Sequence, residues 1–113
     1  MIKRITLVKA RNGMSPADFR AYYENKHAPM AKRLFPMVAD YRRNFIGAVA
    51  RHPEGLAHPG FDAITELWFT DDAAFKAFTE KLARPEVRAE VQADEAKFMQ
   101  VDQTWSFVVD EVK

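Results

Sequence analysis

The sequence predicts one α+β domain in which four strands form a sheet and two helical regions cover it. Four short segments alternate between apolar and polar side chains, and two longer segments repeat apolar side chains at helical spacing. Their order is strand, helix, strand, strand, helix, strand. This βαββαβ order is typical of the ferredoxin-like fold, with a four-stranded antiparallel sheet and helices on one face. A length of 113 residues suits a single domain over residues 1–113.

The alternation predicts strands over residues 2–9, 40–49, 61–69 and 103–109. The third strand carries large apolar groups on both faces, Leu67 and Phe69 on one and Ile64 and Trp68 on the other, so both faces should be covered. The helices of the chain can cover only one of them. We therefore expect a second chain to cover the other face, and a symmetric homodimer is the commonest arrangement.

Helical spacing predicts a first helix to about residue 34 and a second region over residues 71–98 that is broken at Arg84-Pro85. Ser15-Pro16 is a strong helix start, because serine caps and proline suits the first turn. Pro29 has no N–H and disfavours helical backbone at Ala28, so we expect a kink or break there.

Composition excludes several classes of partner and site. The chain has 17 Lys and Arg against 16 Asp and Glu, and the two signs are interleaved, so neither nucleic acid nor an anionic membrane is expected. The absence of cysteine excludes disulfides, thiolate catalysis and Cys-ligated metal. His52 and His58 have no metal-site spacing, and no metal is expected. No apolar run is long enough for a signal peptide or a membrane span, so we expect a cytoplasmic protein.

His27 is the best candidate for chemistry. It shares the apolar stripe of the first helix with Tyr23, four residues earlier. An imidazole there is either a general acid–base group or a core histidine bonded to a backbone carbonyl. Tyr41 and Arg43 share one face of the second strand, where a phenol could hold a substrate oxygen and a guanidinium a carboxylate. The alternatives are a core role for both tyrosines and an interface or surface ion pair for Arg43.

Two further segments have simpler interpretations. Asp94-Glu95 is expected on a solvated helix face, paired with Lys97 or with a strand arginine, because adjacent helical residues do not face each other. The loop over residues 51–60, which is rich in proline and glycine, is expected to be mobile and to edge the entrance of a pocket.

Four motifs resemble the EthD family of the dimeric α/β-barrel superfamily. They are Ser15-Pro16-x-x-Phe19, Tyr22-x-x-x-x-His27-Ala28-Pro29, Ile64-x-Glu66-Leu67-Trp68-Phe69 and Ala93-Asp94-Glu95-Ala96-Lys97-Phe98. The resemblance implies a homodimer whose two sheets form a barrel, with a small-molecule pocket between helices and sheet in each subunit.

The resemblance extends to individual site residues. His27 and Tyr41 correspond to a histidine and a tyrosine in the pocket of one member, methylmuconolactone methylisomerase. Tyr23, Arg43 and Leu67 would bind substrate. The isomerase has a cysteine where this chain has Leu67, which argues against that particular reaction.

Two classes of function follow. The first is a cofactor-free enzyme, of isomerase, lyase or cyclase type, that transfers protons on a small aromatic, lactone or polyketide-like carbonyl compound. The second is a dimeric carrier or accessory protein with the same pocket and no catalysis. A monooxygenase of the same fold, with His27 as an axial haem ligand, is a third option that no residue pattern favours.

Overall fold

The computed structural model describes residues 1–113 and confirms the expected order of elements. The elements, in chain order, are β1 (Ile2–Val8), α1 (Pro16–Tyr22), a π-helical segment (Tyr23–His27), α2 (Ala28–Leu34), β2 (Asp40–Phe45), β3 (Ala63–Phe69), α3 (Asp72–Leu82), α4 (Pro85–Glu95), a 3₁₀ turn (Val101–Gln103) and β4 (Trp105–Val109).

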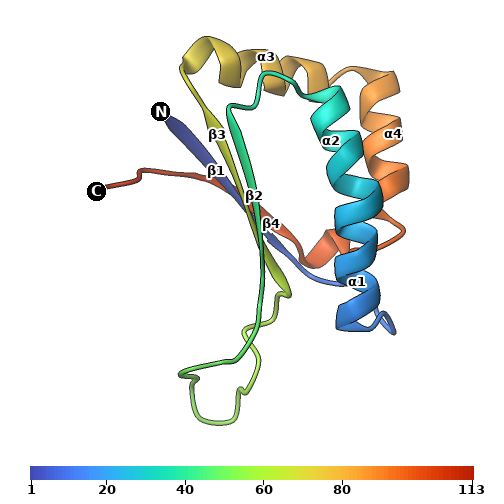
Figure 1. The fold of residues 1–113 in the computed structure, drawn as a ribbon, viewed down its shortest axis with the longest axis vertical. Coiled ribbons are helices and arrows are strands. Elements are labelled where there is room, and N and C mark those ends of the chain that lie inside the picture. The colour runs from blue at the N-terminus through green and yellow to red at the C-terminus, as the bar shows by residue number, and fades with distance from the viewer.

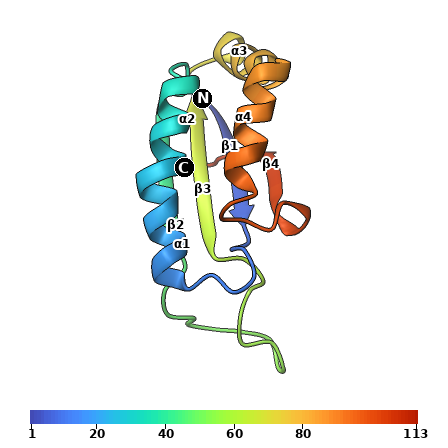
Figure 2. The same cartoon turned by 90° about the vertical axis from the view of Figure 1, so that its right-hand side faces the viewer.

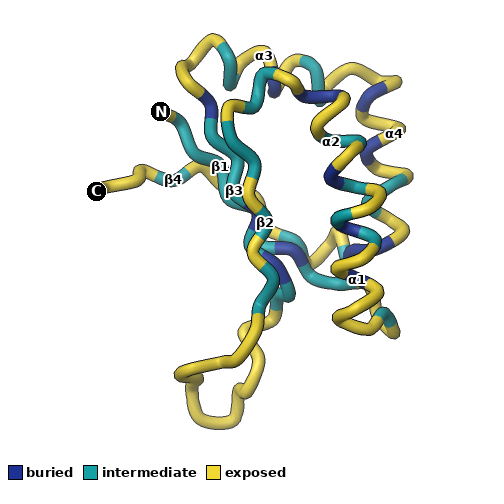
Figure 3. Tube along the Cα trace, in the orientation of Figure 1, coloured by how far each residue is buried: buried dark blue, intermediate teal, exposed yellow.

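The sheet is four-stranded, with the order β2-β3-β1-β4, and every neighbouring pair is antiparallel. All the helices lie on one face of it (Figures 1 and 2). This is the predicted ferredoxin-like arrangement. The strands are shorter than predicted, because β2 already ends at Phe45 and β3 begins only at Ala63. The segment between them extends away from the helices as an exposed loop (Figures 1 and 3).

Of the kink or break predicted at Pro29, the break is wrong, because the helix continues through the proline, and what the structure has instead is a local disturbance of the helix just before it. Ala28 has helical dihedral angles, φ −61° and ψ −43°. The Ala28 N–H donates to the carbonyl of Tyr23, five residues back, so the disturbance is a wider π-helical turn placed before the proline. Pro29 then lies in the first turn of α2, where a missing N–H costs little.

In the middle of β1 the two faces carry the opposite of the usual side chains, whereas Ile2 and Val8 at its ends pack into the core as expected. Ile5 and Leu7 are paired with Glu66 and Ile64 of β3 and lie on the face away from the helices. Arg4 and Thr6 instead point toward the helices and line a cavity there. Polar side chains on the helix-facing side cannot close the core, so this strand leaves room between sheet and helices.

The buried core consists of two separate clusters. One is Val8, Phe19, Tyr23, Ala63, Phe98 and Met99, and the other is Leu34, Phe35, Phe69, Phe78, Val87 and Val91. Only 14 of 113 residues are buried, so the core is small for the length of the chain. Members of both clusters line the same cavity, which therefore lies between them.

Candidate functional site

The cavity lies between the helix-facing side of the sheet and the helices, and its volume is about 360 Å³. Ligand pockets commonly fall in this range, from about 300 Å³ upward. Hydrophobic residues supply 12 of its 21 lining residues, so it suits a small, largely apolar molecule. Its polar lining comes from both walls. Arg4 and Tyr41 belong to the sheet, and His27 belongs to the helical side.

His27 is held by a carboxylate from the far end of the chain. Its Nδ1 lies 2.6 Å from Oδ2 of Asp94, and both side chains are 13% exposed. The hydroxyl of Tyr22 donates to the other oxygen of Asp94 over 2.8 Å. The expected solvated position of Asp94 is therefore wrong. The last turn of α4 packs against the π-helical segment, and its carboxylate meets the imidazole instead of Lys97 or an arginine.

This contact sets the proton arrangement of the imidazole. A carboxylate accepts from Nδ1–H, so Nε2 is the nitrogen that can take up or deliver a proton, and it has no hydrogen-bond partner within the chain. Burial lowers the pKa of His27 below its ordinary value, and the Asp94 hydrogen bond offsets part of that lowering. His27 is therefore neutral at pH 7 and has a free basic nitrogen.

Two phenols lie on the same cavity, and their hydroxyls differ. The Tyr23 hydroxyl makes a short hydrogen bond with the Thr65 hydroxyl, and its ring meets the His27 ring edge-on at 5.1 Å. The Tyr41 hydroxyl is buried beside the Tyr23 hydroxyl and interacts with it, but it makes no hydrogen bond of standard geometry. Burial raises the pKa of Tyr41, so its proton is retained. Tyr41 is thus the phenol with a hydrogen bond to offer a ligand.

The remaining two candidates have different positions. Leu67 lines the cavity beside Tyr41 and gives it an apolar wall. Arg43 does not line it. Its Nε and Nη2 donate to the two oxygens of Glu24, over 2.6 and 3.0 Å, and its guanidinium lies 4.6 Å from the Tyr41 ring centroid. Arg43 therefore packs against the Tyr41 ring. Its guanidinium N–H groups already donate to Glu24, so they are not free to bind a substrate carboxylate.

Sequence reasoning missed three residues of the site, namely Asp94, Glu95 and Arg4. Asp94 and Glu95 belong to one of the motifs that resemble the EthD family, so the motif was the available signal. Glu95 lines the cavity, and burial, more than the neighbouring Asp94, raises its pKa. Arg4 had no signal, because strand alternation alone does not say which face meets the helices.

The loop between β2 and β3 does not edge this cavity, contrary to expectation, because none of residues 46–62 lines it. His58 instead lies 3.5 Å from Asp62, at the base of the loop. No group of three His, Cys, Asp or Glu side chains is placed to hold a metal ion. No helix has both the length and the apolar character needed to cross a membrane.

The family model described as the EthD domain matches residues 11–102. The chain belongs to the EthD family. That match includes His27, Tyr41 and Asp94, whereas β1 and β4, which contribute Arg4, Thr6 and Ser106 to the cavity, lie outside it. No curated protein matches the chain by sequence.

Solved structures support the fold of this EthD protein. A protein from Arabidopsis thaliana is 16% identical with a TM-score of 0.67, and the match covers 100% of this chain and 97% of that one. An EthD family protein from Bacillus halodurans is 18% identical with a TM-score of 0.65, and the match covers 99% of this chain and 100% of that one. A variant of SnoaB from Streptomyces nogalater, described as a cofactor-independent oxygenase, is 14% identical with a TM-score of 0.55. That match covers 99% of this chain and 93% of the other. Two further neighbours are described as dimeric ferredoxin-like proteins.

The environment of His27 predicts its titration. Because burial lowers its pKa, the imidazole should titrate below the value of about 6.5 of an unperturbed histidine. Asp94→Asn removes the negative charge that favours the imidazolium, so the midpoint should fall further. A pH titration of the His27 ring signals by NMR, compared with the chain unfolded in urea, measures both shifts. A midpoint above 6.5 in the folded protein would contradict the buried, neutral assignment.

Proposed function

We propose that this EthD protein is a cofactor-independent enzyme that transfers protons on a small aromatic, lactone or polyketide-like carbonyl compound. The observation that supports it is the imidazole of His27, held through Nδ1 by Asp94 and neutral in a largely apolar cavity. A purely structural role would not explain why the second ring nitrogen is left without a hydrogen bond at the wall of a cavity.

The reaction we propose begins with removal of a proton from carbon next to a carbonyl. His27 Nε2 takes that proton, and Asp94 stabilises the imidazolium that forms. The Tyr41 hydroxyl donates a hydrogen bond to the oxygen on which negative charge develops. Return of the proton to another atom of the substrate completes an isomerisation, or a lyase or cyclase reaction if a bond breaks or forms in between.

Proton transfer can be tested before the natural substrate is known. The protein is incubated in D₂O with a panel of aryl ketones and enol lactones, and NMR follows exchange of the protons next to the carbonyl. His27→Asn keeps polarity and approximate size but cannot act as a base. We expect exchange to fall about 10²-fold or more, with a stability change of no more than about 2 kcal/mol. His52→Asn, in the exposed loop, is the matched control and should leave exchange unchanged.

Four outcomes would contradict the proposal. A His27→Asn variant with full exchange would remove His27 from the chemistry. A variant whose residual exchange only follows its folded fraction would give the histidine a structural role. Binding of these compounds without exchange in the wild type would indicate a carrier or accessory protein. Consumption of oxygen during turnover would assign the oxygenase chemistry for which SnoaB is described.

We further propose that the chain forms a homodimer through the sheet face away from the helices. Half-buried Ile5, Leu7 and Ile64 lie on this face, and β4 adds exposed Trp105 and Phe107 in register with Leu7 and Ile5. The chain has no element to cover these side chains. Two neighbours of the same fold are described as dimeric, which supports a dimer for this chain.

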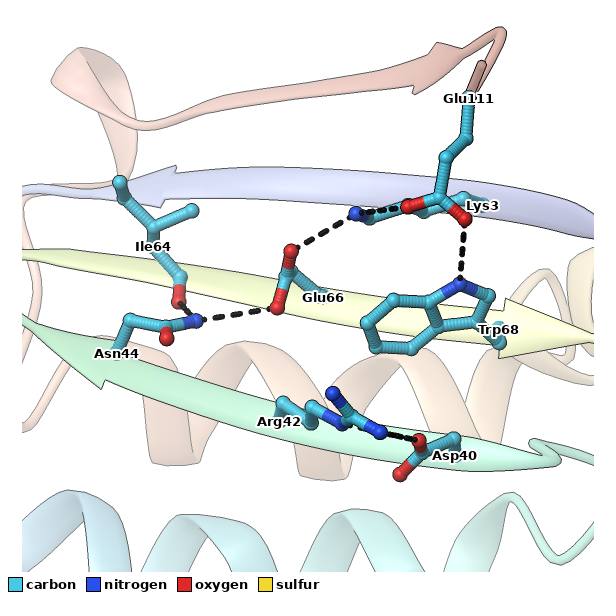
Figure 4. Close-up of polar contacts among 8 residues, drawn as sticks. All are labelled: Lys3, Asp40, Arg42, Asn44, Ile64, Glu66, Trp68 and Glu111. Carbon is cyan, nitrogen blue, oxygen red and sulfur yellow. Dashed lines mark hydrogen bonds and ion pairs between the residues drawn. The ribbon is translucent and has the colours of Figure 1, made fainter. Parts of the chain in front are cut away.

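The other end of this face is polar and ordered (Figure 4). Lys3 bridges Glu66 and Glu111 over 2.9 and 2.8 Å, and the Trp68 ring lies between Lys3 and Arg42, at 4.6 and 5.0 Å from its centroid. Trp68 is therefore positioned flat on the sheet, as a contact surface requires. An apolar end beside a polar, charge-paired end resembles the core and rim of protein interfaces.

Trp68→Glu tests the dimer. A third carboxylate beside Glu66 and Glu111 would repel both and remove the aromatic surface. We expect sedimentation to show a dimer for the wild type at micromolar concentration, through an interface of more than about 1,000 Å², and a monomer for the variant. Ala89→Glu adds the same charge to an exposed position on α4 and should remain dimeric. A monomeric wild type, or a dimeric Trp68→Glu variant, would contradict the assignment.

A further inference from the structure

Arg4 is a cation in the cavity that makes no hydrogen bond and no close ion pair, and its nearest counter-charge is the carboxylate of Glu95, at longer range. It lies on the helix-facing side of β1, between Leu67 of β3 and Val108 of β4 in the register of the sheet. It lines the cavity and is only partly exposed, yet it takes part in no ion pair and no hydrogen bond. Its guanidinium carbon lies 5.2 Å from the centroid of the Phe78 ring.

The comparison with Arg43 shows how unusual this is. Arg43 also lies on the helix-facing side of the sheet, and Glu24 satisfies it through two hydrogen bonds. A charge removed from water without a partner is costly, and proteins normally pair it. Arg4 carries that cost, and burial lowers its pKa accordingly. Arg4 lines the cavity in which a ligand would lie, and it also borders a neighbouring hollow beside α3 and β4.

The surroundings of Arg4 narrow the kind of group it can meet. Glu95 lines the same cavity but forms no ion pair with Arg4. The two charges act on each other at a distance, but burial outweighs the effect of Arg4 and raises the pKa of Glu95, so the guanidinium N–H groups still have no hydrogen-bond acceptor. The other cation on the cavity wall, Lys32, is exposed. One planar guanidinium without a second buried cation matches a singly charged, planar anion better than a phosphate.

We propose that Arg4 binds a carboxylate of the ligand, so that the substrate of this cavity is a small aromatic or lactone carboxylic acid. This rests on the proposed function, because it uses the same cavity. Arg4 is on the sheet wall and His27 on the helical wall. Anchoring the acid at one wall would present the carbonyl part of the molecule to His27 and Tyr41. Arg4 is then the residue that selects acids over neutral analogues.

Binding of two matched probes tests the proposal. 1-Naphthoate and 1-naphthamide have nearly the same shape but differ by one charge, and each is titrated into the protein at pH 7.5 while NMR follows the cavity residues. We expect naphthoate to bind at least about 10-fold more tightly to the wild type, the size of a charge-assisted hydrogen bond. Arg4→Met should bind both probes equally, with its affinity for naphthamide unchanged.

Three controls separate recognition from folding. Arg20→Met removes a guanidinium that also lies over an aromatic ring, 4.9 Å from the Phe45 centroid, but that is exposed and does not line the cavity. It should keep the full preference. Arg4→Lys keeps the charge but not the planar guanidinium, so it should keep part of the preference for naphthoate over naphthamide. Arg4→Met should melt at the wild-type temperature or above, because it removes an unpaired charge.

The outcomes distinguish this inference from the proposed function. Equal binding of both probes by the wild type, or a preference that survives Arg4→Met, would overturn the role of Arg4 and leave the His27 chemistry in place. Tighter binding of 1-naphthyl phosphate than of naphthoate would overturn the choice of carboxylate. Failure of both naphthalene probes to bind at millimolar concentration would contradict a ligand cavity, and the proposed function would fall with it.

Discussion

The hydrogen bond between His27 and Asp94 is the contact on which the site depends. It joins the π-helical segment to the last turn of α4, two parts of the chain between which α2, β2, β3 and α3 intervene. It also decides which imidazole nitrogen carries the proton, and Tyr22 fixes the carboxylate from the other side. Without Asp94, the ring would have no fixed tautomer, and burial alone would decide its protonation.

The inverted polarity of the middle of β1, from Arg4 to Leu7, helps to explain why the fold has both a cavity and an uncovered sheet face. Arg4 and Thr6 point toward the helices, where a fully packed protein would have apolar side chains. Ile5 and Leu7 point away, where a monomer would have polar ones. A small core and an apolar outer surface follow together. We infer that dimerisation and ligand binding supply the burial that the single chain lacks.

Hydrophobic periodicity was enough to predict the fold, because it records which faces of strands and helices are covered. The cavity residues His27, Tyr23, Tyr41 and Leu67 were also predicted, partly from resemblance to the family. The predicted break at Pro29 did not occur, because a wider π-helical turn before the proline lets the helix continue although Pro29 has no N–H to donate. The partner of His27 was not predictable from periodicity, since a contact between residues 67 positions apart depends on how α4 docks.

The tautomer of His27 is the most direct test of this account. Long-range ¹H–¹⁵N correlation spectra of the uniformly ¹⁵N-labelled protein at pH 7.5 distinguish a protonated ring nitrogen from a bare one. We expect a neutral ring with the proton on Nδ1, donated to Asp94, and a bare Nε2 facing the cavity. A ring protonated on Nε2, or an imidazolium at this pH, would contradict the role assigned to His27 and with it the proposed proton transfer.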